Sequence, residues 1–482
     1  MAAKIYGYTS LTGGGVAALD SIDGSILNVG DLAYGTDGNE TYSMILDGSG
    51  DAESSPDCIA PDSNAGVKRW KRRHDEAKAY RAAAPTNGHM ASLDADGDLV
   101  DSGKIAANVV EKTAATPSTG DSLIYNGSLW VPSVPYRKNI IINGDTLISQ
   151  RGISFSGTTT IAFPCDRFKY AQSNDGSMNV LGGTNSGSVP TFAQAGTNFT
   201  YSLLLDVSTA DAALAAGQYS LLEYAVEGYD IAPHRGKQMT LSFWIRSTKT
   251  GTYSVAFKNS GTDRSYVSLF TISSASTWEK KIITFTMHDG TSGTWNWTNG
   301  SGLRIAWSIG MGSTYQTATT DSWINGNFNG TAACANGMDH ADNDFRITGV
   351  QLEVGSVATP FEIRPFAEEL ALCQRYYEKS YDVTTPVGTA AVNGYNRGVA
   401  LSTVLLYNYG QSFFSTTKRD QPTVNIYSHN SGSANLAWRE GVGDDRLIAY
   451  NRSTKGFSTY SDTGALTVGW AYLYHWTADA EL

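Results

Sequence analysis

The sequence contains little cysteine, few charged residues and no long apolar run. Its four cysteines, Cys58, Cys165, Cys334 and Cys373, lie far apart, with no Cys-x-x-Cys or Cys/His spacing. This spacing excludes a recognisable zinc or redox site and argues against a disulfide framework, so we expect buried free thiols. The apolar runs fall short of the ~20 residues that cross a bilayer, and the N-terminus lacks the apolar core of a secretory signal. We therefore expect no membrane insertion, and assembly in a cytoplasm.

Charged residues make up only 17% of the chain, and the acidic ones outnumber the basic ones, which leaves a formal net charge of −11. No cluster of lysine and arginine is long enough to form a groove for a phosphate backbone. One basic run, residues 68–74, lies at the end of a small predicted domain, where a solvated face or a subunit contact is the better interpretation. We therefore expect no nucleic acid partner.

Glycine is abundant instead, with 50 residues, together with much serine, threonine and asparagine. This composition is typical of short strands joined by many turns, and the length suggests about three folding units. The sequence predicts a mostly β protein. Its expected parts are a small N-terminal β domain, an extended stalk, a jelly-roll β-sandwich, a short helix and a small C-terminal β-sandwich.

The predicted domain boundaries follow changes of pattern along the chain. Residues 1–75 combine short strands with Asp/Gly turns, and residues 76–138 form a polar stalk or linker. Residues 139–365 contain strand patterns in which apolar and polar positions alternate, as in a jelly roll. Apolar residues at helical spacing predict a helical connector over residues 366–381, and a β tip domain follows over residues 382–482. The strands expected in the jelly roll are 199–205, 218–226, 238–246, 251–259, 266–272, 278–287, 303–309 and 345–354.

Two groups of motifs resemble proteins of phage tails. Within residues 1–75, Leu-Thr-Gly-Gly-Gly, Leu-Asp-Ser-Ile-Asp-Gly, Gly-Asp-Leu-Ala and Lys-Arg-Trp follow one another as in the N-terminal attachment domain of phage tail fibres. Further along, residues 241–247, 278–285 and 347–355 resemble the carbohydrate-binding-module-like jelly rolls of phage tail proteins. The most specific match is Ala-Thr-Pro-Phe-Glu-Ile-Arg-Pro at residues 358–365.

The resemblance implies a tail fibre subunit located in the virion tail. Residues 1–75 are expected to dock on tail or baseplate proteins, and the subunit is expected to form a homo-oligomer, most often a trimer. The β domains are expected to meet host surface polysaccharide, where many weak contacts add up through effective concentration. Two alternatives remain: a purely structural tail or baseplate component, and a glycan depolymerase, although no β-helix repeat of ~20 to 30 residues is present.

Sugar recognition needs an aromatic face that stacks on a pyranose ring and polar groups for its hydroxyls. A loop with Trp295, Asn296 and Trp297, followed by Tyr315 and Trp323, contains such groups. The alternative is that these tryptophans close the core or a subunit interface. A second candidate set of aromatic residues lies in the predicted tip: Tyr407, Tyr409, Trp438, Tyr450 and Trp476.

No set of residues has the spacing of a catalytic site: there is no nucleophile elbow, no His-Glu-x-x-His and no phosphate loop. We therefore expect no enzyme activity and no cofactor. The acidic loop with Asp339, Asp342 and Asp344 is a candidate structural calcium site, because calcium prefers oxygen ligands, but loops of this composition are more often simple turns.

Overall fold

The computed structural model describes residues 138–183, 188–407, 412–464 and 466–482, together with short strands and a few neighbouring residues between positions 5 and 133. In it, 43% of the residues are in strands and 7% in helices, so the predicted mostly β class is confirmed. No helix in these residues is long and apolar enough to cross a bilayer. The chain divides into two compact units, Met1–Ala114 and Ala115–Leu482.

The first unit contains a small sheet with the strand order β1-β2-β3-β5-β4. Leu19, Leu27, Ala33, Met44 and Leu46 form its buried core. The basic run that the sequence singles out contributes β5, which pairs with β3 and is therefore part of the sheet. A separate hairpin follows, formed by β6 and β7. The bounds of these strands are β1 (Ile5–Tyr8), β2 (Leu32–Asp37), β3 (Glu40–Asp47), β4 (Cys58–Ile59), β5 (Arg69–Arg72), β6 (His89–Leu93) and β7 (Leu99–Ile105).

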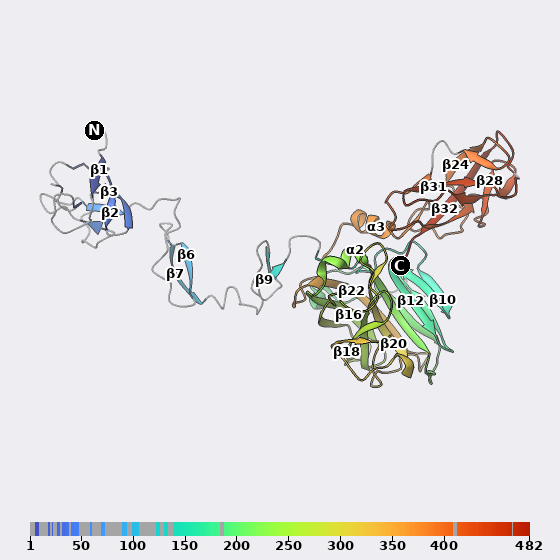
Figure 1. The fold of residues 1–482 in the computed structure, drawn as a ribbon, viewed down its shortest axis with the longest axis horizontal. Coiled ribbons are helices and arrows are strands. Elements are labelled where there is room, and N and C mark those ends of the chain that lie inside the picture. Colours follow the sequence, from blue (N-terminus) through green and yellow to red (C-terminus); the bar gives the residue numbers. More distant parts are fainter. Residues whose placement is uncertain are drawn as a thin grey trace. The chain divides into compact units, whose positions relative to one another are not determined.

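The second unit begins with a hairpin of β8 (Ser122–Tyr125) and β9 (Trp130–Ser133) and continues into a β-sandwich (Figure 1). One sheet of the sandwich has six strands in the order β10-β13-β14-β22-β16-β19. Their bounds are β10 (Ser154–Thr158), β13 (Ser177–Leu181), β14 (Leu203–Thr209), β22 (Asp344–Val354), β16 (Gln238–Ser247) and β19 (Glu279–Thr286).

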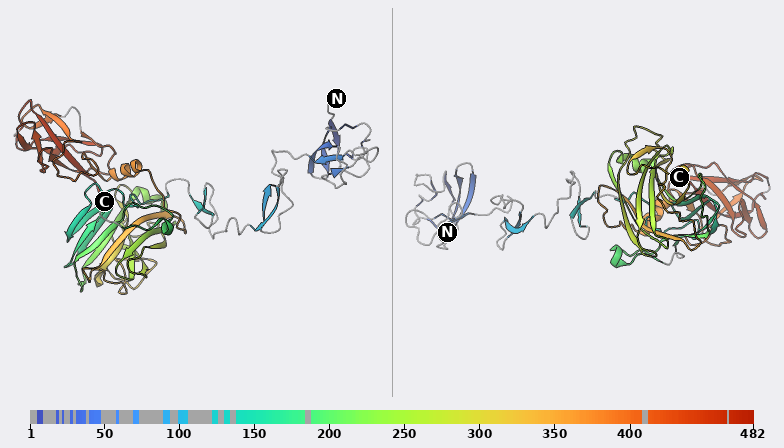
Figure 2. Two further views of the ribbon diagram at one scale, coloured as in Figure 1. Left: turned by 180° about the vertical axis from the view of Figure 1, so that it is seen from behind. Right: turned by 90° about the horizontal axis from the view of Figure 1, so that it is seen from below.

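The other sheet has seven strands in the order β11-β12-β15-β20-β17-β18-β21 and packs face to face with the first (Figure 2). Two single-turn helices lie in the connections of the sandwich: α1 (Phe192–Ala195) joins β13 to β14 of the six-stranded sheet, and α2 (Gly228–Ile231) directly follows β15. The strand bounds are β11 (Ile161–Cys165), β12 (Phe168–Ser173), β15 (Tyr219–Glu227), β20 (Ser301–Met311), β17 (Gly251–Lys258), β18 (Arg264–Ile272) and β21 (Trp323–Asn325).

The core of the sandwich follows from strand periodicity, because alternate side chains of a strand point to the same face. In β16, Leu241, Phe243 and Ile245 are buried and meet core residues of the other sheet such as Trp307. Phe243 and Trp307 pack edge to face with ring centroids 5.7 Å apart. All eight strands expected between residues 139 and 365 overlap observed strands, whereas β10 to β13 and the short β21 were not predicted.

The predicted helical connector over residues 366–381 is partly wrong. Helix α3 (Phe366–Gln374) covers its first part, but Tyr377–Lys379 forms strand β23, which pairs with the last strand of the chain. Cys373 and Tyr376 are buried in a small cluster with Ile142 and Ile148. The apolar residues of this segment are therefore used by a strand and a local core, which ends the helix early.

The C-terminal strands form a sheet that encloses a second core, including Ile426, Phe457, Tyr472 and Tyr474. Its long strand β32 pairs with β23, β24, β27 and β28. The hairpin of β28 and β29 was not predicted. The bounds are β24 (Asn396–Ala400), β25 (Leu405–Tyr407), β26 (Ser412–Phe413), β27 (Thr423–Ser428), β28 (Leu436–Arg439), β29 (Gly443–Arg446), β30 (Ile448–Tyr450), β31 (Gly456–Tyr460) and β32 (Ala471–Asp479).

Three of the four cysteines, Cys165, Cys334 and Cys373, are free thiols. Cys165 and Cys373 are fully buried, and burial raises the pKa of each thiol well above its usual value. Both thiols therefore behave as small apolar core groups rather than as nucleophiles. The side chain of Cys58 lies outside the described residues.

Candidate functional site

Three of the predicted sugar-binding residues, Trp295, Trp297 and Trp323, meet at one end of the sandwich. Trp295 and Trp297 lie in the loop between β19 and β20, and their rings stack with centroids 5.0 Å apart and planes inclined by 6°. Trp323 of β21 meets Trp295 edge to face, with centroids 5.6 Å apart. The antiparallel pairing of Tyr266 with Trp323 brings β21 to this loop. The structure thus joins residues that are separate in the sequence.

The faces and polar atoms of this tryptophan cluster are largely used by the fold. His288 packs against Trp295 at 5.1 Å, and the Arg235 guanidinium lies 5.2 Å from the Trp297 ring centroid. The indole N–H of Trp295 donates to Ser292, and all three tryptophans pack against the main core. The cluster therefore contributes to the closed end of the sandwich, which is the alternative that the sequence left open for these residues.

The other two predicted residues do not add an open sugar site here. The side-chain oxygen of Asn296 accepts hydrogen bonds from Thr298 N at 2.9 Å and from Gly300 N at 3.2 Å, so it holds the loop. Tyr315 lies apart from the cluster and meets Tyr219 edge to face, with centroids 5.4 Å apart. Tyr219 begins β15, whereas the tryptophan loop lies beyond the end of that strand.

The three carboxylates of the acidic loop do not converge on a common point. Lys249 forms an ion pair with Asp339, and the Arg246 guanidinium lies 3.2 Å from the Asp344 carboxylate. The Asp342 side chain is exposed. Within the described ranges no group of three or more His, Cys, Asp or Glu residues could hold a metal ion. Asp339 and Asp344 therefore serve as partners of basic side chains.

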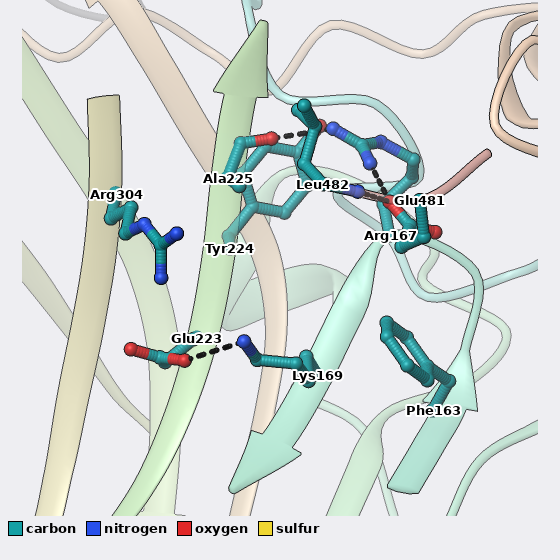
Figure 3. Close-up of a pocket in the computed structure, with 9 residues that line it drawn as sticks. All are labelled: Phe163, Arg167, Lys169, Glu223, Tyr224, Ala225, Arg304, Glu481 and Leu482. Atoms are coloured by element: carbon teal, nitrogen blue, oxygen red, sulfur yellow. Dashed lines mark hydrogen bonds and ion pairs between the residues drawn. The ribbon is translucent and has the colours of Figure 1, made fainter. Parts of the chain in front are cut away.

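A row of charged side chains crosses four neighbouring strands, β12, β15, β20 and β17, on the outer face of the seven-stranded sheet. Figure 3 shows three members of this row, Lys169, Glu223 and Arg304. Lys169 of β12 is the register partner of Glu223 in β15, and Lys258 of β17 is the register partner of Arg304 in β20. Each lies next to a core residue in its strand, so it points away from the core. The Glu223 carboxylate lies 2.9 Å from Lys169 Nζ and 3.8 Å from Lys258 Nζ.

Burial and charge act against each other in this charged row. Burial disfavours the ionised carboxylate of Glu223, but Lys258 and Lys169 outweigh burial and lower the pKa of Glu223. Burial lowers the pKa of Lys258 to about 8, although the Glu223 carboxylate opposes this shift. Lys258 Nζ also donates to Asn329 Oδ1 at 2.8 Å. At neutral pH the carboxylate is therefore ionised and Lys258 is mostly charged.

The row ends at a small cavity of about 10 Å³, which the last two residues of the chain help to close. Arg167 and Glu481 form an ion pair, and Arg167 also donates to the carbonyl oxygen of Ala225 at 2.5 Å. Arg304 differs: in the described part of the chain its side chain makes no hydrogen bond or ion pair, and its buried Nε has no partner. The cavity is lined by Phe163, Arg167, Lys169, Glu223, Tyr224, Ala225, Arg304, Glu481 and Leu482 (Figure 3).

Trp470, which no sequence pattern singles out, lies in an open depression of about 510 Å³ on the C-terminal domain. Trp470 is 42% exposed and immediately precedes β32. Arg397 and Glu440 lie beside it and form an ion pair at 3.1 Å, with more than half of each side chain exposed. The Arg439 guanidinium lies 5.7 Å from the Trp470 ring centroid. An exposed indole, a carboxylate and a guanidinium thus share one hollow.

The second predicted set of aromatic residues is scattered. Trp476 is buried in the core of the C-terminal domain, and Trp438 stacks on His429 with centroids 5.7 Å apart. Tyr450 is exposed and packs beside Tyr460 at 5.1 Å. The side chain of Tyr407 and the whole of Tyr409 lie outside the described residues. Trp470 lies just before β32, which begins at Ala471.

No family model matches the sequence, and no match is found among curated proteins. Solved structures that resemble part of the chain include the enzymatically active domain of tailspike protein 4 from bacteriophage CBA120. It shows 14% identity and a TM-score of 0.25, and the match covers 45% of this chain and 21% of the tailspike. The chain thus spans about a fifth of the length of that protein.

Two carbohydrate-binding modules are also similar to part of the chain. The N-terminal cellulose-binding domain of Cellulomonas fimi β-1,4-glucanase C shows 13% identity and a TM-score of 0.20, covering 43% of this chain and 99% of that domain. The family 11 carbohydrate-binding module from Clostridium thermocellum shows 11% identity and a TM-score of 0.20, covering 42% of this chain and 96% of the module. These scores are too low to carry an argument about function.

Proposed function

We propose that the chain is a non-enzymatic attachment subunit of the phage tail fibre type that binds host surface glycan through the Trp470 depression. The observation that carries this proposal is the exposed Trp470 ring beside Arg397 and Glu440 in a hollow of about 510 Å³. An aromatic face packs on the apolar side of a pyranose ring, and a carboxylate with a guanidinium can bind its hydroxyl groups.

The groups in the depression suit binding rather than hydrolysis. Glycosidases use two carboxyl groups on either side of the scissile bond. Among the described residues that line the depression, the single carboxylate is Glu440, and it is already paired with Arg397. A lone, exposed, paired carboxylate is a hydrogen-bond acceptor for hydroxyl groups, but it lacks the partner that a depolymerase needs.

The tail fibre part of the proposal is supported by the sequence motifs of residues 1–75 and 358–365. In this proposal residues 1–75 dock on tail or baseplate proteins, and the subunits assemble as a homotrimer in the host cytoplasm. Three copies then present three Trp470 depressions to host polysaccharide. Because linked sites raise the effective concentration, weak binding at each depression is sufficient.

The test compares binding of the full chain with that of Trp470→Ala on a panel of bacterial surface polysaccharides and on whole cells. The expected result is at least about a tenfold loss of affinity in the variant, because the stacking surface is removed. Phe413→Ala is the matched control: it removes another exposed aromatic ring of the same domain, outside the depression, and is expected to bind normally.

Equal binding by Trp470→Ala and Phe413→Ala would overturn the assignment of the site. If the wild-type chain bound none of the polysaccharides or cells, the purely structural tail or baseplate component would become the better explanation. Release of reducing ends from any polysaccharide would contradict the non-enzymatic part of the proposal.

A further inference from the structure

The charged row on the seven-stranded sheet contains more positive than negative charge. Lys169, Lys258 and Arg304 face the single carboxylate of Glu223, so three cations against one anion leave an excess of two positive charges. Arg167 and Glu481 lie beside the row as an ion pair, and Glu481 also lies 3.3 Å from Arg151. An excess of this kind, in a partly buried place, attracts an oxyanion more strongly than the same charges would in water.

Arg304 is the group in this row that lacks a partner. Lys169 is held by Glu223, and Lys258 is held by Asn329 and Glu223, whereas the Arg304 side chain makes no hydrogen bond or ion pair within the described residues. Arg304 is half-buried, and its one buried polar atom without a partner is Nε, although buried polar groups are normally hydrogen-bonded. Its planar guanidinium matches a carboxylate or phosphate with two parallel bonds. The unpartnered Arg304 therefore indicates a ligand with an oxyanion.

The size of the cavity limits how such a ligand enters. A volume of about 10 Å³ holds roughly one water-sized group, so a carboxylate or phosphate stays at the mouth of the cavity and directs one of its oxygens toward Arg304. Phe163 and Leu482 line the same opening and border a sugar ring that stays outside, although the Arg151 guanidinium lies 4.5 Å from the Phe163 ring centroid and Leu482 packs against a small core cluster. Figure 3 shows Arg304, Lys169 and Phe163 around this opening, on β20, β12 and β11.

We propose that Arg304 and Lys169 form a second glycan site, separate from the Trp470 depression, that selects a saccharide with an oxyanion. The oxyanion is a carboxylate of a uronic acid or a phosphate of a phosphorylated sugar. This inference rests on the proposed glycan-binding function and deepens it, because it makes acidic surface polysaccharide the class of ligand. Glu223 holds Lys169 by an ion pair, and Lys258 adds positive charge to the row; neither contacts the ligand.

The test is calorimetric titration of the full chain with trigalacturonate and with neutral trigalactose. Arg304→Gln is expected to weaken binding of trigalacturonate at least tenfold and to change binding of trigalactose less than twofold. Arg452→Gln is the matched control, since it removes one positive charge from an exposed position of the other domain and is expected to change neither affinity. A glycerol phosphate oligomer in a third titration distinguishes phosphate from carboxylate as the preferred oxyanion.

The outcomes separate this inference from the proposed function. If Arg304→Gln and Arg452→Gln bind trigalacturonate equally, or if the wild-type chain prefers neither acidic oligomer over trigalactose, the Arg304 site is overturned while the Trp470 site can still stand. If Trp470→Ala binds both sugars like the wild type while Arg304→Gln loses the acidic one, the Trp470 assignment fails instead. Lys169→Gln gives the same test if Arg304→Gln does not fold.

Discussion

Arg167 of the sandwich forms an ion pair with Glu481, the penultimate residue of the chain. The Arg167 side chain is 1% exposed, and its guanidinium also lies 3.4 Å from the Tyr376 ring centroid. Further contacts join the same parts: Arg375 Nη2 lies 2.6 Å from the Glu227 carboxylate, and Arg419 Nη1 donates to Asn299 O at 2.8 Å. The C-terminal residues thus tie the last domain to the sandwich.

Removing the charge of Glu481 should destabilise the protein. In Glu481→Gln the buried guanidinium of Arg167 loses its counter-charge, and breaking one partner of a buried pair costs about 3 kcal/mol. Thermal unfolding followed by circular dichroism should show a clear fall in Tm. Glu440→Gln is the control, because its pair with Arg397 is exposed and worth under about 1 kcal/mol. Equal shifts in Tm for the two variants would contradict this account.

The tryptophan cluster should affect stability rather than binding. Trp295 packs against Trp297, Trp323 and His288, so Trp295→Ala should lower the stability by roughly 2–4 kcal/mol. Its glycan affinity, measured on the folded fraction, should equal that of the wild type. Trp470→Ala should behave in the opposite way, losing affinity with little change in Tm. A loss of affinity in Trp295→Ala without a change in Tm would restore the tryptophan loop as a sugar site.

Asp145 should make the stability depend on pH. Burial, followed by the nearby Glu369 carboxylate, raises the pKa of Asp145 from 3.8 to about 6. The folded state therefore binds more protons than the unfolded state between pH 4 and 6, and stability is lost as the pH rises through this window. Asp145→Asn should remove this penalty and raise the stability at pH 7.5 by about 1–2 kcal/mol.

The measurement for Asp145 is Tm at pH 4 and at pH 7.5. The gain of Asp145→Asn over the wild type should be present at pH 7.5 and largely absent at pH 4, where the wild-type carboxyl is protonated. Asp175→Asn, at an exposed position, is the control and should change Tm little at either pH. The same gain at both pH values would show that the pKa of Asp145 is not the cause.

Binding of an acidic oligosaccharide should weaken at alkaline pH. The charged neighbours of Lys258 are Glu223 and Arg304, and Lys169 lies on the other side of Glu223. Burial lowers the pKa of Lys258 to about 8. As the pH rises from 7 to 9 the row loses this positive charge, so the affinity for trigalacturonate should fall by roughly three- to tenfold. Titration with neutral trigalactose over the same range should show no such change, and Lys258→Gln should flatten the pH profile. A flat profile in the wild type would contradict the role of Lys258.

Local patterns account for what the sequence predicted correctly. The strand predicted at residues 218–226 is observed at Tyr219–Glu227, and the one predicted at 238–246 is observed at Gln238–Ser247. Alternation of apolar and polar residues is a property of neighbouring positions, so one sequence is enough to read it. The hairpin of β28 and β29 was not predicted because neighbouring positions of β29, such as Asp444 and Asp445, are both polar. A half-buried strand usually alternates apolar and polar residues.

The candidate sites depended on contacts that are not local. Lys169 meets Glu223, and Lys258 meets Arg304, because strands distant in the chain pair in a particular register. The register of such strands is decided by the packing of both sheets, which a sequence pattern does not reveal. For the same reason the sequence did not single out Arg304 as a basic group without a partner.

Strand periodicity and turn residues act over a few positions, so the amino-acid order predicts that this protein is mostly β and where most of its strands lie. It also identified aromatic residues as the groups to examine. The packing of distant segments, by contrast, leaves Trp295 among other rings and Trp470 exposed. Whether a ring face is free depends on which distant segments pack against it, and that is settled only when the sheets come together.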